Sequence, residues 1–118
     1  MKDKTTRLRH RDVQDAIELM NGRWRGAILA CLCEEGPKRF SELKTILNPV
    51  TAKVLINELR YLEWNLMVYA EKSTETRNSI VYGMTEHGKT LAPVIYALQN
   101  WSLQHRSLMF KKLSEQVF

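Results

Sequence analysis

Residues 41–63 have the sequence SELKTILNPVTAKVLINELRYLE, which contains two short amphipathic patterns on either side of a tight turn. In the second pattern, leucines recur at the spacing of one helix face: Leu55, Leu59, Leu62 and Leu66. Thr51 is a favourable N-cap residue, so this pattern predicts a helix from Ala52 to about Glu63 with the leucines buried.

The first pattern predicts a shorter helix. Ser41 is a suitable N-cap residue, and the apolar side chains expected to face the core are Leu43, Ile46 and Leu47. Pro49 ends this helix, because proline disfavours helical geometry in the residue before it. Two helices joined by such a turn form a helix-turn-helix motif.

The residues before this motif predict two more helices. Asp12 is expected to cap the first, whose apolar side chains share one face: Val13, Ala16, Ile17 and Met20. Asn21-Gly22 ends it, since both residues tolerate the left-handed conformation. The second helix extends from about Trp24 to Glu35 and ends at Gly36-Pro37, and residues 38–40 are long enough only for a small strand.

The periodicity changes after residue 65. Residues 66–70 and 79–84 have the composition of strands, and the segment 71–78 between them is wholly polar, which predicts a β-hairpin. Thr85 is expected to cap a final helical region that Pro93 kinks. The apolar stripe of this region comprises Leu91, Val94, Ile95, Leu98, Trp101, His105, Leu108 and Met109.

This order of elements predicts a mainly α fold with a small β-hairpin (α+β), namely a winged helix-turn-helix with extra N- and C-terminal helices. We expect a basic N-terminal arm over residues 1–11 and a single winged-helix domain over residues 12–118. The last apolar stripe is longer than a small domain needs to cover its core, which favours helix pairing between two subunits. The alternative is that the tail packs back on its own domain.

Dimerisation helices are therefore expected over about residues 12–20 and 86–113. A dimer places two reading helices about 34–36 Å apart on a two-fold site. The candidate dimerisation residues are Val13, Ile17, Met20, Leu91, Ile95, Leu98, Trp101 and Leu108.

The composition limits the class of protein. The 118 residues include 18 Lys+Arg and 13 Asp+Glu, so the formal net charge is +5, and 44% are hydrophobic, which excludes disorder of the whole chain. The polar, basic start does not resemble a signal peptide, and no apolar run approaches the ~20 residues that cross a bilayer. We expect a cytoplasmic protein without a membrane partner.

Motifs of enzymes and cofactor sites are missing from the sequence. It has no Gly-rich phosphate loop, no metal-binding His-Glu pattern and no recognisable Ser/His/Asp grouping, so we expect no enzymatic activity, cofactor or metal. Cys31 and Cys33 are expected to point to nearly opposite faces of a helix, where they pack as structural thiols and cannot bridge each other.

The helix over residues 51–63 has a polar, partly basic front, and such a helix fits the DNA major groove. Lys53 can reach a phosphate or a guanine edge, and Asn57 carries the paired amide groups that match an adenine edge. The alternative for this face is ordinary solvation, but the short helix before it and the hairpin after it favour groove binding.

Double-stranded DNA is thus the expected partner. Arg77 at the hairpin tip and the pair Arg23 and Arg25, which flank Trp24, are further candidates for phosphate contacts, whereas Trp24 itself is expected in the core. The candidate DNA-binding residues are Arg23, Ser41, Thr51, Ala52, Lys53, Asn57, Arg60 and Arg77.

Several motifs in order resemble the HxlR-type bacterial winged-helix regulators over residues 12–101. They are Asn21-Gly22-Arg23-Trp24, the run GPKRFSEL at 36–43, Leu55 with LRYLE at 59–63, and YGMTEHG at 82–88. The resemblance implies a homodimer that binds operator DNA and represses or activates transcription. It places the helix of about 51–63 in the major groove, the wing of about 73–79 on flanking DNA, and the terminal helices in the dimer.

Three positions depart from the family pattern. Many members carry a cysteine just before the first helix, which in some of them senses electrophiles or oxidants, and this chain has His10-Arg11 there. Ser79 stands at a position where the family wing often has arginine, and Glu58 replaces a residue that is commonly basic.

Two other functions stay open at this point. One is a protein-protein interaction module of winged-helix fold without specific DNA binding, and the other is a ligand-binding or thiol-redox protein that acts through Cys31 or Cys33. The operator, the regulated genes, the sign of regulation and a small-molecule effector are also left open by the sequence.

Overall fold

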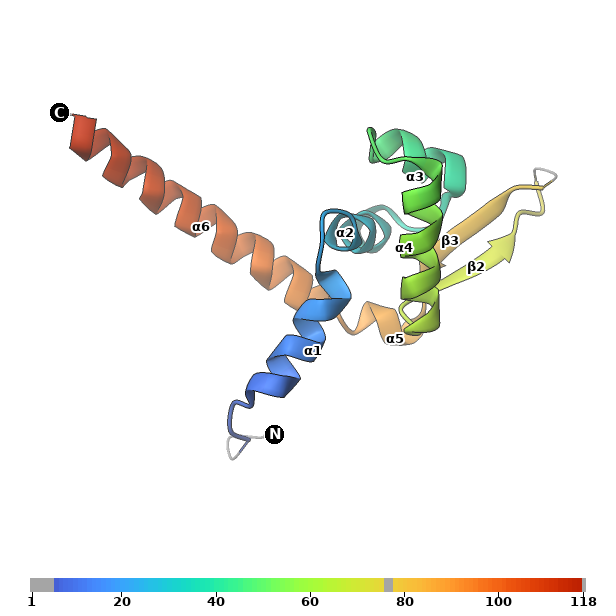
Figure 1. Ribbon diagram of the computed structural model, residues 1–118, viewed down its shortest axis with the longest axis horizontal. Helices are drawn as coiled ribbons and strands as arrows, with labels where there is room; N and C mark the ends of the chain where they lie inside the picture. Colours follow the sequence, from blue (N-terminus) through green and yellow to red (C-terminus); the bar gives the residue numbers. More distant parts are fainter. Residues whose placement is uncertain (1–5, 76–77, 118) are drawn as a thin grey trace.

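The computed structural model describes residues 6–75 and 78–117. Its helices and strands follow the predicted order, with the hairpin between α4 and α5 (Figure 1). Their bounds are α1 His10–Met20, α2 Arg25–Glu35, β1 Lys38–Arg39, α3 Phe40–Ile46, α4 Ala52–Trp64, β2 Val68–Lys72, β3 Ile80–Met84, α5 Glu86–Lys89 and α6 Ala92–Val117.

The strands form a three-stranded antiparallel sheet in the order β1-β3-β2. The hairpin prediction is confirmed, and Val68 lies opposite Met84 while Lys72 lies opposite Ile80. The short strand β1 completes the sheet, with Lys38 opposite Tyr82. A mainly α winged helix-turn-helix with a small sheet is therefore the fold of this chain.

The core lies between the helices and one face of the sheet. Leu55, Leu59 and Leu62 of α4 are fully buried, as predicted. Leu66 is 67% exposed, so its assignment to the buried stripe was wrong. The reason is that α4 ends at Trp64 and Leu66 adopts a left-handed conformation (φ 66°), which takes its side chain out of the helical spacing.

Of the N-cap residues predicted for α3 and α4, one is confirmed and one is wrong. Thr51 caps α4 as predicted, since its Oγ1 accepts a hydrogen bond from the Val54 N–H at 3.2 Å. Ser41 does not cap α3, because the helix already begins at Phe40 and the Glu42 carboxylate accepts from the Arg39 N–H at 2.7 Å instead.

Two further predictions in these helices were wrong. Asp12 lies in the first turn of α1, which begins at His10, so it does not cap the helix. Ile46 at the end of α3 is 47% exposed, whereas Leu43 and Leu47 are buried as expected.

The final helical region is divided rather than kinked. Thr85 caps α5 as predicted, accepting from the Gly88 N–H at 2.8 Å, and α5 ends at Lys89. Pro93 is the second residue of α6, where a missing N–H removes no bond within the helix, so it does not kink α6.

Helix α6 leaves the rest of the chain soon after it begins (Figure 1). Leu91 and Ile95 pack against the core, but every described side chain from Tyr96 to Gln116 is exposed. The tail therefore does not pack back on its own domain. Among the described residues, no helix has the length and apolar character needed to span a membrane.

Candidate DNA-binding surface

The outer face of α4 presents the polar residues that the sequence singled out. Lys53, Asn57 and Arg60 are all exposed, while the leucines behind them fill the core. Thr51 and Ala52 are exposed at the N-terminus of α4, where the first backbone N–H groups of a helix have no partner within it. A helix whose inner face is packed on the core and whose outer face presents polar side chains can enter a DNA groove without rearrangement.

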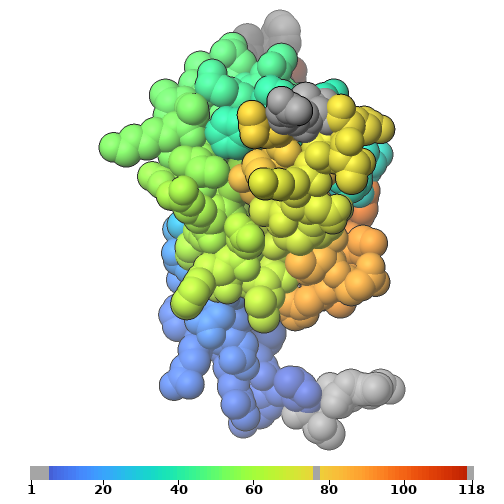
Figure 2. All heavy atoms as spheres, turned by 90° about the vertical axis from the view of Figure 1, so that its right-hand side faces the viewer, coloured from blue at the N-terminus to red at the C-terminus, as the bar shows by residue number. Residues whose placement is uncertain are grey.

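The hairpin lies beside α4 on the same side of the molecule (Figure 2). Between them is an open groove of about 440 Å³, lined by residues of α3, α4, β3 and the two residues before β3: Phe40, Ser41, Ile56, Asn78, Ser79, Ile80 and Tyr82. Ser41 is exposed at this groove, so the structure brings it next to α4 and the hairpin although its role as a cap was wrong.

The wing is only partly described. The Ser73 N–H donates to the Ser79 carbonyl at 2.8 Å and closes the hairpin, and Lys72 is exposed at the end of β2. Asn78 has a left-handed conformation (φ 64°) that turns the chain back into β3. Arg77, the predicted wing contact, lies outside the described residues.

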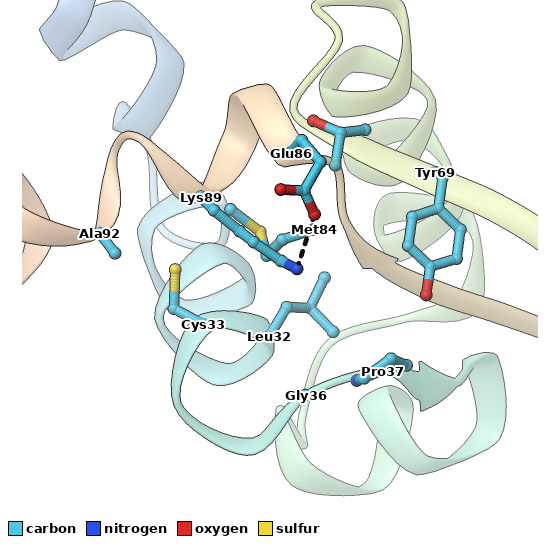
Figure 3. Close-up of a pocket in the computed structure, with 10 residues that line it drawn as sticks. Leu32, Cys33, Gly36, Pro37, Tyr69, Met84, Glu86, Lys89 and Ala92 are labelled. Atoms are coloured by element: carbon cyan, nitrogen blue, oxygen red, sulfur yellow. Dashed lines mark hydrogen bonds and ion pairs between the residues drawn. The ribbon is translucent and has the colours of Figure 1, made fainter.

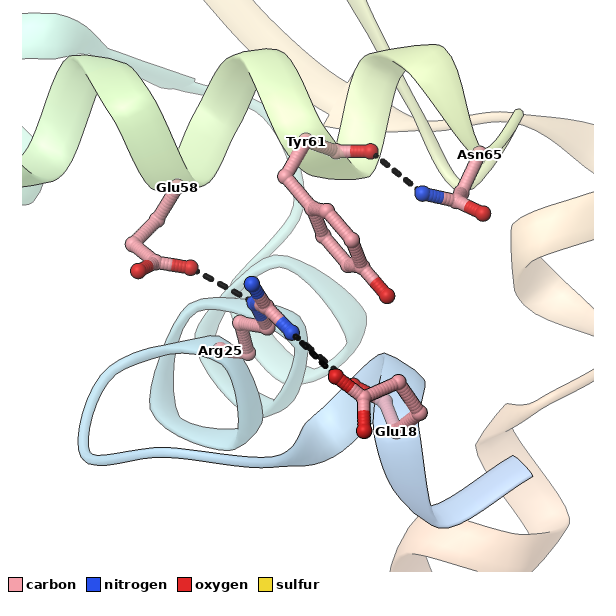
Figure 4. A network of polar contacts seen from close by, with 5 residues as sticks. All are labelled: Glu18, Arg25, Glu58, Tyr61 and Asn65. Carbon is pink, nitrogen blue, oxygen red and sulfur yellow. Dashed lines mark hydrogen bonds and ion pairs between the residues drawn. The ribbon is translucent and has the colours of Figure 1, made fainter. Parts of the chain in front are cut away.

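Arg23 and Arg25 differ in their surroundings. Arg23 is exposed and its guanidinium lies 4.5 Å from the centre of the Trp24 ring, while Trp24 packs against the core as predicted. Arg25 is held within the protein: its Nε donates to Glu58 Oε1 at 2.6 Å, and its Nη1 donates to the Glu18 carbonyl at 3.0 Å (Figure 4). Its assignment as a phosphate contact is therefore not supported. The sequence did not predict this network, because Arg25 and Glu58 are 33 positions apart.

The two cysteines are free thiols with different surroundings. Cys31 is buried and Cys33 is half-buried, and burial raises the pKa of both thiols. Glu35 raises the pKa of Cys31 further. The thiolate, which is the nucleophile, is therefore a minor form of either residue near neutral pH.

A cavity of about 500 Å³ lies between the end of α2, the sheet and α5 (Figure 3). Its lining is mainly apolar, with Leu32 and Met84 among the lining residues, and it is bordered by the Lys89–Glu86 ion pair at 3.0 Å. The sequence did not reveal this cavity, because its lining comes from segments far apart in the chain. Among residues 6–75 and 78–117, no group of histidine, cysteine and acidic residues is arranged to hold a metal ion.

An outward-facing helix, a short helix before it and a hairpin beside it define a winged helix-turn-helix protein. The model of the HxlR-like helix-turn-helix family matches residues 19–109, so this chain belongs to that family. Its members among the curated relatives are transcriptional regulators, and regulation through DNA binding is therefore the function of its class.

Two relatives from Bacillus subtilis (strain 168) illustrate the similarity. The uncharacterised HTH-type transcriptional regulator YkvN is 38% identical over 84 residues, which cover 71% of this chain and 70% of the relative. The HTH-type transcriptional regulator YodB is 34% identical over 92 residues, which cover 78% of this chain and 81% of YodB.

Solved structures of similar regulators have the same fold as this chain. The reduced form of the redox regulator HypR superposes with a TM-score of 0.76 at 28% identity, covering 83% of this chain and 96% of HypR. The reduced form of YodB from B. subtilis superposes with a TM-score of 0.73 at 32% identity, covering 82% of this chain and 94% of YodB. YodB has also been solved in a quinone-bound form.

Proposed function

We propose that this chain acts as a homodimeric, sequence-specific transcriptional regulator on a two-fold operator. Helix α4 of each protomer enters the major groove, and the hairpin contacts the flanking DNA. The observation that carries the proposal is the orientation of α4, whose leucines are fully buried while Lys53, Asn57 and Arg60 are exposed.

Phosphate contacts are assigned to the residues around this helix. The N-terminus of α4 favours an anion, since free N–H groups and the helix dipole both point there. Ser41 lies on the groove between α3, α4 and the hairpin, where a DNA strand beside α4 would pass. Arg23 and Arg77 complete the set of proposed DNA contacts, the latter from the sequence alone.

The dimer is assigned to α1 and α6. Val13 and Ile17 of α1 are 46% and 45% exposed, and Leu98, Trp101 and Leu108 of α6 are 51%, 62% and 63% exposed. The apolar faces of α6 and α1 continue toward the core at Leu91 and Ile95 and at Met20, respectively. Apolar stripes of this length are uncommon on a monomer and are typical of helix pairing between subunits.

Other sides of α6 are apolar as well. Tyr96, Leu103 and Phe110 follow one another at seven-residue intervals and are 46%, 52% and 66% exposed. A helix with apolar side chains on more than one side needs more than one neighbouring helix. A partner subunit that contributes both its α1 and its α6 supplies them, which favours the arrangement proposed here.

An effector of low molecular mass belongs to the proposal too. The cavity beside α5 has a volume of about 500 Å³, and its lining includes Ala92, the first residue of the proposed dimerisation helix α6. Ligand sites commonly have volumes of roughly 300–1,000 Å³.

The test is to select DNA fragments bound by the protein from the source genome and to measure binding to the selected site and to a scrambled site. A specific, saturable shift at moderate salt supports the regulator. Equal binding to both sites contradicts it and favours an interaction module without specific DNA binding.

Replacing Lys53 by alanine is expected to weaken operator binding roughly tenfold, because a charge-assisted contact is lost at an exposed position that does not support the core. If Lys53 contacts a phosphate, the slope of log affinity against log salt also falls by about 0.9. Fluorescence anisotropy at several salt concentrations measures both quantities.

The control is Lys111→Ala, which removes an exposed lysine from α6. It is expected to leave the salt slope of operator binding unchanged. A folded Lys53→Ala variant with the affinity and salt slope of the wild type would remove Lys53 from the DNA contacts.

Replacing Asn57 by alanine is expected to reduce discrimination at one base pair of the operator by about 1–3 kcal/mol, since the amide can no longer form paired bonds to a base edge. Binding to a set of operators with single-base changes measures this loss. A loss of equal size on every sequence would show that Asn57 contacts the DNA backbone and reads no base.

A further inference from the structure

The side chain of Arg25 joins three helices. It extends from the first residue of α2, and its Nε donates to Glu58 Oε1 on α4 at 2.6 Å. Its Nη1 donates to the backbone carbonyl of Glu18 on α1 at 3.0 Å, and the Glu18 carboxylate lies 3.5 Å away. The guanidinium carbon lies 3.5 Å from the centre of the Tyr61 ring, also on α4 (Figure 4).

Within this network, the Arg25–Glu58 pair is shielded from solvent more than the ion pair of α5. The Arg25 and Glu58 side chains are 19% and 26% exposed, compared with 61% and 92% for the pair Lys89–Glu86. Ion pairs that are partly withdrawn from water are screened less by salt and hold their geometry better than exposed pairs. The contact between Arg25 and Glu58 is therefore a fixed part of the fold.

Helix α1 depends on this contact for its position. Among its side chains, all of which are described, none is fully buried, and only Leu19 and Met20 near its end pack against the core. Arg25 binds the carbonyl of Glu18 in the last turn of α1, where a positive charge also complements the helix dipole. Arg25 is thus the side chain whose hydrogen bonds join the end of α1 to α4.

Only arginine meets these requirements. Its planar group donates from Nε and from Nη1 in different directions while its face covers the Tyr61 ring, whereas a lysine ammonium is a point charge that cannot do all three. The same guanidinium neutralises Glu58, which follows Asn57 on α4 and would otherwise repel DNA phosphates.

We propose that Arg25 is a positioning residue that fixes the angle between α1 and α4, and thereby the separation of the two recognition helices on a two-fold operator. This inference rests on the proposed function, because α1 must be part of the dimer and α4 must read DNA. Arg25 then determines the half-site spacing that the dimer accepts, without touching a base.

The test uses operators whose half-sites are moved apart or together by one or two base pairs. Each base pair changes the separation by roughly 3.4 Å and rotates one half-site relative to the other. The variant is the double replacement Arg25→Gln with Glu58→Gln, which removes the Arg25–Glu58 ion pair without changing the net charge or leaving the Glu58 carboxylate without its cation. Dimer mass and circular dichroism verify that it is assembled and folded.

The wild type is expected to bind the altered spacings about tenfold more weakly than the native spacing, and the double variant to differ by less than about threefold. Binding of the double variant to a single half-site and to scrambled DNA is expected to equal that of the wild type. The matched control, Lys89→Gln with Glu86→Gln, removes an exposed ion pair at 3.0 Å and is expected to retain the wild-type spacing preference.

A folded double variant with the spacing preference of the wild type would overturn the inference, as would an equal loss of affinity on all DNAs. If the double variant does not fold, Arg25→Lys provides the measurement, since it keeps the charge and is expected to weaken the spacing preference. Failure of the wild type to bind its selected operator would contradict the proposed function instead, so the two failures are distinguishable.

Discussion

Replacing Leu98 by glutamate is expected to yield a monomer whose affinity for the operator is lower by about 100-fold or more, because binding through two linked sites is lost. Leu98 is 51% exposed within the protomer, so the replacement does not disturb the core of the winged domain. In the proposed dimer, however, it lies in the middle of the apolar stripe of α6, next to Trp101. A charge buried there without a partner disfavours association.

Sedimentation velocity measures the assembly state, and anisotropy on the selected operator measures the affinity. The matched control is Leu98→Met, which changes the same side chain without introducing a charge. Leu98→Met is expected to remain a dimer with normal affinity. A Leu98→Glu variant that stays dimeric would exclude this stripe from the interface and assign dimerisation to another face.

Local signals in the sequence were sufficient for most of the fold. Thr51 and the leucines at helical spacing predicted α4 and its orientation, and the polar segment between two apolar runs predicted the hairpin. These predictions depend on residues close together in the chain, where the cap at Thr51 and the periodicity of the leucines indicate the same helix. The exposure of Lys53 and Asn57 followed directly from the burial of the leucines.

The errors arose where local rules compete or where distant residues meet. Leu66 fits the helical repeat, but the chain leaves the helix two residues earlier. Pro93 fits a kink within a helix and also the first turn of a new one, and nothing in its own neighbourhood decides between them. The partners of Arg25 come from α1 and α4, so the cation that pairs with Glu58 could not be identified from the residues around Glu58 in the sequence.

The second large effect is expected at Gly88 of α5, which packs against the segment that connects α4 to β2. Replacing Gly88 by alanine is expected to lower the free energy of unfolding by about 3 kcal/mol, since overpacking of a rigid site is costly. A Cβ at Gly88 would lie 2.1 Å from the Met67 carbonyl oxygen. That oxygen cannot move aside freely, because it accepts from the Thr85 N–H at 3.1 Å and lies 3.3 Å from the Thr85 hydroxyl.

Gly26→Ala is the matched control, because it is the same replacement at a second helical glycine. A Cβ there would meet only the Met20 carbonyl oxygen at 3.5 Å, which is an ordinary contact. Alanine in a helix is favoured over glycine, so this variant is expected to be as stable as the wild type or more stable by up to about 1 kcal/mol. Urea denaturation at equal protein concentration compares the variants, since a dimer is stabilised by mass action. Equal stability of Gly88→Ala and Gly26→Ala would mean that α5 is not held against the Met67 carbonyl, and that the chain entering α6 is free to shift relative to the DNA-binding helices.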